Sequence, residues 1–226
     1  MRYLSSAAIT VLLLAPGMPA TAAPTGPPVR AEVPPGPTSC DFDAWTSFRA
    51  KAPIAIRAEP AETAKMLGSL PVSTKVDEEI GSVEFRVVEA RSGWLRIDQA
   101  TDPGGMDDKG EPLPLRDVYQ GTGWIPANAA QIGIQSALGY MRPDADSPVI
   151  LDLGSDWLTD MSDIQTIRAC SGPWLLLDYR VRRERTPTEA LLDIPDAAIR
   201  TDTAWFRGIC ANQYTTCDMK SVDRRK

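Results

Sequence analysis

The chain contains no histidine among its 226 residues. Imidazole is the side chain that titrates nearest neutral pH, and it serves Ser-His-Asp and Cys-His catalysis and many zinc sites. Its absence therefore excludes those chemistries. Cys-x-x-Cys pairs and glycine-rich phosphate loops of either usual spacing are also missing. We expect neither a cofactor nor a bound metal.

Long hydrophobic runs are missing as well. The one sizeable run, residues 7–15, is followed at once by proline and glycine and is about half of the ~20 apolar residues that cross a bilayer. An early cation, Arg2, and small residues up to Ala22 complete the pattern of a secretory signal peptide. We expect cleavage of residues 1–22, which makes the mature protein periplasmic or secreted, with no stable membrane insertion.

Positive charge is in short supply. The net charge of the whole chain is −6, and loss of Arg2 with the signal peptide makes it −7. Because phosphate backbones repel an acidic protein, we expect no nucleic-acid partner. The short basic tail at residues 220–226 is too small to alter this.

Six prolines occur in residues 23–39, which offer almost nothing that a core could bury. This composition favours an extended, polyproline-like linker between the export signal and the folded part. The folded part, residues 40–219, is long enough for one medium domain or two small ones.

All cysteines lie in the expected exported part, and their even number outside the cytoplasm predicts two disulfides. Four cysteines allow three pairings. The short loop between Cys210 and Cys217 is the easiest to close, which would leave Cys40 to pair with Cys170. Zinc is the weaker alternative, since no histidine is available.

Period-2 alternation of apolar residues dominates the folded part, as in residues 54–57 and 83–87, and predicts β-strands with one buried face. No segment sustains a helical period over three turns. Two turn sequences, at residues 91–93 and 171–173, each separate an alternating run from a tryptophan. We expect tight hairpins at both places.

Two similar units follow one another along the chain. Each has an arginine after a short strand (Arg57, Arg142), an acidic turn with proline, and two later tryptophans. The tryptophans recur at offsets of 80 and 81 residues, which indicates a duplication. The four equivalent residues are Trp94 with Trp174 and Trp124 with Trp205.

These motifs resemble the bacterial SH3 family of small five-stranded barrels outside the cytoplasm. The first unit carries Ile56-Arg57, Pro60, Gly93-Trp94 and Gly123-Trp124-Ile125, and the second is a weaker match without glycine before Trp205. The resemblance implies an all-β fold of two tandem SH3-like barrels, at residues 40–134 and 135–219. It also implies a non-catalytic binding role, with a cell-wall peptide or an envelope protein as the partner.

Two groups of residues are candidates for ligand binding. The four tryptophans could line a shallow aromatic groove for peptides, although tryptophans at strand starts commonly pack into the core. The only basic cluster could grip carboxylates of a partner, or could merely keep a strand edge from pairing. Its members are Arg180, Arg182, Arg183 and Arg185.

Two other functions remain open at this point. Paired carboxylates suffice for glycoside cleavage, so a cell-wall hydrolase is the runner-up. The acidic candidates lie in turn-rich stretches, where a solvated loop is the plainer interpretation: they are Asp77, Glu78 and Glu79, and Asp102, Asp107, Asp108 and Glu111. The third function is that of an inhibitor or structural partner of another exported protein.

Overall fold

The structure is a computed structural model that describes residues 30–72, 82–102, 107–109, 111, 113–210 and 222–223. The expected signal peptide, the first part of the linker, Cys217 and the acidic group at residues 77–79 lie outside these residues. The described chain is predominantly β, which confirms the predicted all-β class. No helix in it is long and apolar enough to cross a membrane.

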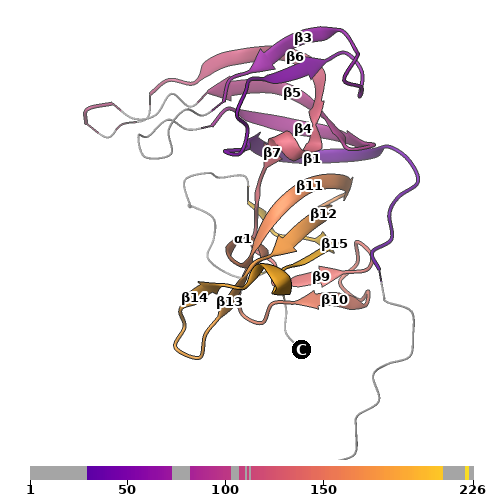
Figure 1. The fold of residues 1–226 in the computed structure, drawn as a ribbon. Coiled ribbons are helices and arrows are strands. Elements are labelled where there is room, and N and C mark those ends of the chain that lie inside the picture. The colour runs from indigo at the N-terminus through magenta and orange to yellow at the C-terminus, as the bar shows by residue number, and fades with distance from the viewer. Residues whose placement is uncertain are drawn as a thin grey trace, which may run out of the picture.

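A seven-stranded antiparallel sheet forms the first half and curls into a half-barrel (Figure 1). Its strand order is β3-β2-β6-β5-β4-β1-β7. A short 3-10 turn, η1 (Ala127–Ala129), separates its last two strands in sequence. The strands are β1 (Thr38–Thr46), β2 (Ile54–Arg57), β3 (Met66–Leu70), β4 (Glu84–Arg91), β5 (Trp94–Asp102), β6 (Arg116–Pro126) and β7 (Ala130–Gln131).

A five-stranded antiparallel sheet forms the second half, in the order β10-β9-β15-β12-β11. Its strands are β9 (Leu138–Tyr140), β10 (Val149–Asp152), β11 (Ser162–Ser171), β12 (Trp174–Val181) and β15 (Arg200–Phe206). Two small ribbons accompany it: β13 (Arg183–Arg185) with β14 (Leu191–Asp193), and β8 (Gly133–Ile134) with β16 (Ile209–Cys210). The remaining elements are α1 (Leu158–Met161) and the 3-10 turn η2 (Asp196–Ala198).

The alternation in the sequence forms strands because it gives each one an apolar face. In β2, Ile54 and Ile56 are buried while their neighbours are half-buried. Both predicted hairpins are present, with two-residue turns at Ser92-Gly93 and Gly172-Pro173. Glycine suits both turns because Gly93 and Gly172 have positive φ angles of 81° and 55°.

Five strands follow the same order in the two sheets: β3-β2-β6-β5-β4 in the first matches β10-β9-β15-β12-β11 in the second. The turn after β2 and the turn after β9 also share their hydrogen bonds. The N–H groups of Ala58, Ala61 and Ala64 and those of Met141, Asp144 and Ser147 make equivalent backbone bonds, 83 residues apart. This register aligns Arg57 with Tyr140, and Arg142 with Glu59. The prediction that Arg57 and Arg142 are equivalent is therefore wrong by two residues.

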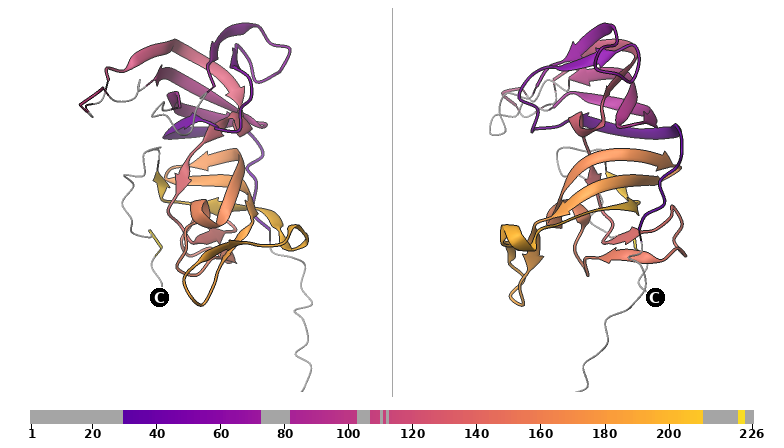
Figure 2. Two further views of the ribbon diagram at one scale, coloured as in Figure 1. Left: turned by 60° about the vertical axis from the view of Figure 1, so that its left-hand side comes forward. Right: turned by 45° about the vertical axis from the view of Figure 1, so that its right-hand side comes forward.

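The two sheets pack against each other through β11, which lies over β1, β4 and η1 (Figures 1 and 2). Buried apolar residues from both halves form one connected cluster; Phe42, Val87 and Ile134 belong to it together with Ile167 and Leu177. The halves therefore share a continuous core. If each half had a separate core, the surfaces of β1 and β11 that face each other would be exposed to water; here they pack together.

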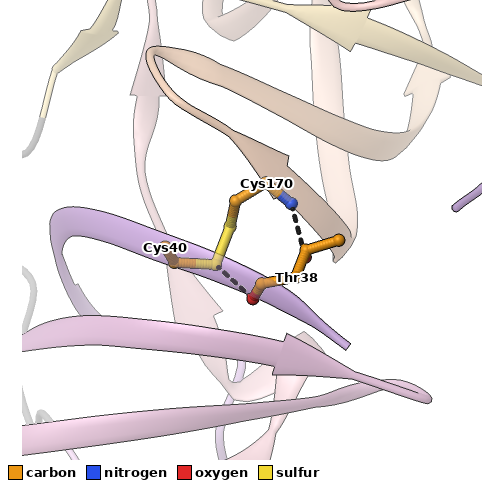
Figure 3. The surroundings of a disulfide bond; sticks show 3 residues. All are labelled: Thr38, Cys40 and Cys170. Carbon is orange, nitrogen blue, oxygen red and sulfur yellow. Dashed lines mark hydrogen bonds between the residues drawn. A yellow bond between two sulfur atoms is a disulfide. The ribbon is translucent and has the colours of Figure 1, made fainter. Parts of the chain in front are cut away.

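A disulfide between Cys40 in β1 and Cys170 in β11 joins the two sheets across 130 residues of sequence (Figure 3). This confirms the pairing that loop length favoured for these two residues. The backbone N–H of Cys170 also donates to Oγ1 of Thr38 at 2.9 Å, so the start of strand β1 is linked to β11 by both a disulfide and a hydrogen bond. Cys210 is disulfide-bonded too, and the described chain contains no free cysteine.

The end of the proline-rich linker is part of the fold. Residues 30–37 run without strand structure beside the second sheet and then enter β1 of the first (Figure 1). The N–H of Glu32 donates to the carbonyl of Met141 at 2.8 Å, and Ala31 packs on a cluster of aromatic residues. Most of the segment is exposed, and Ala31 is the residue of it that packs on this cluster; the extended linker stays a prediction.

Candidate functional site

A cleft of about 550 Å³ lies where the linker, the first sheet and the second sheet meet. Residues 33–37 form one wall, the β4-β5 hairpin forms another through Arg91, Ser92 and Gly93, and Thr166 and Arg168 of β11 complete it. Arg91 is exposed, and no described carboxylate lies within ion-pairing distance of it. The cleft therefore offers an unneutralised guanidinium.

Arg168 is held in place from within the second sheet. Its Nε donates to Oδ1 of Asp178 at 2.6 Å, and the hydroxyl of Thr203 donates to the same oxygen at 2.6 Å. The hydrogen bond that Arg168 donates to Asp178 raises the pKa of Arg168 from its ordinary value. Half of the Arg168 side chain remains exposed, and the residue lines the cleft.

Three of the four predicted tryptophans are buried, as core or rim packing requires. Trp124, Trp174 and Trp205 are 7%, 8% and 1% exposed, and Trp94 is half-buried. These values do not fit an open aromatic groove that runs along all four residues. The structure places two of them in each sheet.

Trp174 and Trp205 share one face of the second sheet with Tyr140, Ala169 and Leu176. The rings of Tyr140 and Trp174 meet edge to face, with centroids 5.2 Å apart. Burial raises the pKa of Tyr140, and the carboxylate of Asp223 adds to the rise. We call these five residues the aromatic face.

The equivalent face of the first sheet is charged. Its residues occupy the same positions in the strand pairing and differ in kind. Arg96 pairs with Glu89 at 3.0 Å, and Arg57 donates to the carbonyl of Ala64 at 3.0 Å. In the order of the aromatic face (Tyr140, Ala169, Trp174, Leu176, Trp205), the counterparts are Arg57, Glu89, Trp94, Arg96 and Trp124.

The predicted basic cluster is mostly neutralised by the chain itself. Arg182 pairs with Asp163 at 3.1 Å, and Arg183 with Asp193 at 3.4 Å. Of the four arginines in the cluster, only Arg180 is exposed and has no ion-pair partner among the described residues. Three of the four arginines are therefore engaged by carboxylates of the chain itself, and binding of a partner's carboxylates by the cluster stays a prediction.

Arg185 of the cluster sits on a carboxylate that is almost fully buried. Its Nε donates to Oδ1 of Asp156 at 2.6 Å, and Asp156 is 7% exposed. Nearby, burial raises the pKa of Asp160, with a further contribution from the charge of Asp156. Removal of Arg185 would leave the buried carboxylate of Asp156 without its ion-pair partner, which gives the pair a structural role.

The acidic loop residues that lie in the described chain are used locally. Oδ1 of Asp107 accepts from the backbone N–H groups of Lys109 and Glu111, which closes a small turn. Asp102 pairs with Arg116 on the neighbouring strand. Neither arrangement brings two carboxylates to opposite sides of a cleft.

Sequence reasoning missed Arg91, Arg168 and residues 33–37 as parts of one site. No local signal marks them, because they come from three segments that only the folded chain brings together. The free charge of Arg91 in an exposed hairpin is the one feature that the sequence could have supplied.

Comparison with protein-family models, curated proteins and solved structures finds no match to this chain.

Proposed function

We propose that the protein is an exported, non-catalytic binding module whose junction cleft holds an acidic peptide, either a cell-wall peptide stem or a segment of an envelope protein. The observation that carries the proposal is the pair of guanidinium groups, from Arg91 and Arg168, at a cleft that both sheets and the linker line. Guanidinium binds carboxylates through two parallel N–H bonds, which selects them over other groups.

The architecture supports a duplicated pair of SH3-like units. The same order of five strands, the equivalent turn hydrogen bonds and the recurring tryptophans are what a duplication leaves behind. Because the cleft lies between the units, a ligand there would contact both. This favours a protein that recognises its ligand through the tandem arrangement and not through one unit alone.

Export is the setting that the proposal requires. A disulfide between sheets forms and persists in oxidising compartments outside the cytoplasm. The predicted signal peptide agrees with this. Wall peptides and envelope proteins are the anionic peptides that an exported chain meets there.

Titration of the full mature protein with soluble wall peptides that carry free carboxylates tests the proposal. We expect Arg91→Gln to weaken binding about tenfold, the loss of one charge-assisted hydrogen bond. Arg180→Gln is the matched control, since Arg180 is an exposed arginine outside the cleft, and it should leave the affinity unchanged. Equal affinity in the Arg91 variant and the wild type would contradict the cleft, and turnover of isolated wall material would favour the hydrolase.

A further inference from the structure

The aromatic face of the second sheet carries a segment of this chain's own linker. Trp205 is 1% exposed, yet its indole N–H reaches a partner: Nε1 donates to the backbone carbonyl of Glu32 at 2.9 Å. The backbone N–H of Glu32 in turn donates to the carbonyl of Met141 at 2.8 Å. Glu32 is therefore fixed through both of its backbone groups by residues more than 100 positions away.

The side chain of Glu32 is also recognised. Its carboxylate lies 3.5 Å from Nη1 of Arg142, and Ala31 packs on the aromatic residues below. A donor, an acceptor, a cation and an apolar floor thus meet one extended residue and its small neighbour. These are the elements by which a folded domain holds an extended peptide.

We propose that the aromatic face is a second peptide-binding site, specific for an extended segment with a small residue followed by an acidic one, and that residues 31–33 fill it in cis. The site is separate from the junction cleft, because none of its recognition groups lines that cleft. The linker reaches both places, since Val33 is a wall of the cleft while Glu32 lies on the face.

The charge difference between the two sheets explains why the segment lies on the second. At the position of Leu176 the first sheet has Arg96, and at the position of Tyr140 it has Arg57. Those arginines are already engaged with Glu89 and the carbonyl of Ala64. The first sheet therefore lacks the apolar floor on which a small residue could pack.

The test uses the full mature chain and a labelled peptide that copies residues 30–35, Arg-Ala-Glu-Val-Pro-Pro. Glu32→Pro in the protein removes the N–H and the carboxylate that hold the segment, and so should empty the face. We expect this variant to bind the peptide at least about tenfold more tightly than the wild type, whose face is filled. The same peptide with glutamine in place of glutamate should bind more weakly.

A second substitution ties the gain to the indole. Trp205→Phe in the Glu32→Pro background should lose the gained affinity about tenfold, since phenylalanine has no N–H. Trp124→Phe, the equivalent change in the first sheet, is the matched control and should keep the gain. Unchanged far-ultraviolet circular dichroism and a retained melting transition verify that each variant is folded.

Three results would overturn the proposal. One is a Glu32→Pro chain that binds the peptide no better than the wild type. Another is a Trp205→Phe variant that keeps the gain. The third is a wild-type dimer, seen by sedimentation, that Glu32→Pro converts to monomer, because the segment would then be exchanged between copies and not bound in cis. A hydrogen-exchange readout supports the same decision without any peptide: the Trp205 indole N–H should exchange slowly in the wild type and at least about tenfold faster in Glu32→Pro.

Discussion

The two sheets share one strand order and place tryptophans at matched positions, yet they treat the face around those tryptophans differently. In the second sheet the neighbours of Trp205 are Tyr140 and Leu176, and the chain's own linker covers them. In the first sheet the neighbours of Trp124 are arginines, which salt-bridge or bond to the backbone. Two sheets with the same order of five strands can thus keep large residues at matched positions while the residues between them decide what the surface binds.

The two sheets also differ at one edge, where the first has strands that the second lacks. The first sheet is extended by β1 and β7, and β1 is the strand that meets the second sheet. The second sheet ends at β11, which is the strand that packs back onto β1. β1 therefore belongs to the first sheet and also forms its contact with β11 of the second. The disulfide between Cys40 and Cys170 links these two strands covalently.

Loss of the disulfide should have the largest effect on stability. A cross-link that spans 130 residues restricts the unfolded chain strongly, so the double variant Cys40→Ser with Cys170→Ser should lose about 4 kcal/mol. This corresponds to a fall in melting temperature on the order of 10 °C. Because the core is continuous across the two sheets, we expect one calorimetric transition in the variant as in the wild type.

The calorimetric result separates two views of the joint. Two transitions in the variant would mean that the sheets unfold independently once the covalent link is gone. An unchanged melting temperature would mean that packing of β11 on β1 alone sets the stability.

Exchange of the face residues between sheets should have the next largest effect. Leu176→Arg places the residue of the first sheet on the aromatic face, where Leu176 is fully buried. Burial of this charge should cost about 3 to 4 kcal/mol in urea unfolding. The reciprocal change, Arg96→Leu, removes a half-exposed ion pair and should cost less than about 1 kcal/mol.

Equal costs for these two substitutions would break the comparison. They would show that the faces tolerate charge alike, and that the linker lies on the second sheet for another reason. A loss in Leu176→Arg together with release of the linker, seen as faster exchange of the Trp205 indole N–H, would sharpen it.

The parts of this fold that local chemistry controls were predictable. Alternation marked β2 and β4, and both hairpin turns followed from glycine next to an alternating run. The pairing of Cys40 with Cys170 followed from loop closure alone. Each of these signals is contained in a few neighbouring residues or in a simple chain-length argument.

The parts that depend on distant contacts were not predictable. Arg57 and Arg142 look equivalent because both are arginines before an acidic turn, but backbone hydrogen bonds after the strands set the register at Ala58 and Met141. The basic cluster looked free partly because two of its partners, Asp156 and Asp163, lie more than 15 residues away. The linker looked unattached because its contacts with Met141 and Trp205 have no counterpart in local sequence.

Alkaline pH should distinguish the sheets by a smaller effect. Burial raises the pKa of Tyr179 in β12 to about 12, with the charge of Asp202 adding to the rise and that of Arg200 opposing it. In the first sheet the pairing of β5 shifts at Gln99, an exposed residue with a φ angle of 58°, and the next core position is Ala100. The ionisable phenol in the core therefore belongs to the second sheet alone at this position.

The sign follows from proton binding in the two states. Below about pH 10 the phenol of Tyr179 is protonated in both the folded and the unfolded chain, so it adds no pH dependence. Between about pH 10 and 12 the unfolded chain loses the proton first, and stability falls as the pH rises, by about 2 to 3 kcal/mol in all. Tyr179→Phe removes this group and keeps the ring that packs edge to face on Phe206. In urea titrations at a series of pH values, the variant should lose less stability than the wild type between about pH 10 and 12. The lysines titrate in both proteins, so their contribution cancels when the two stability curves are subtracted. Parallel curves would mean that the phenol of Tyr179 reaches water in the folded protein.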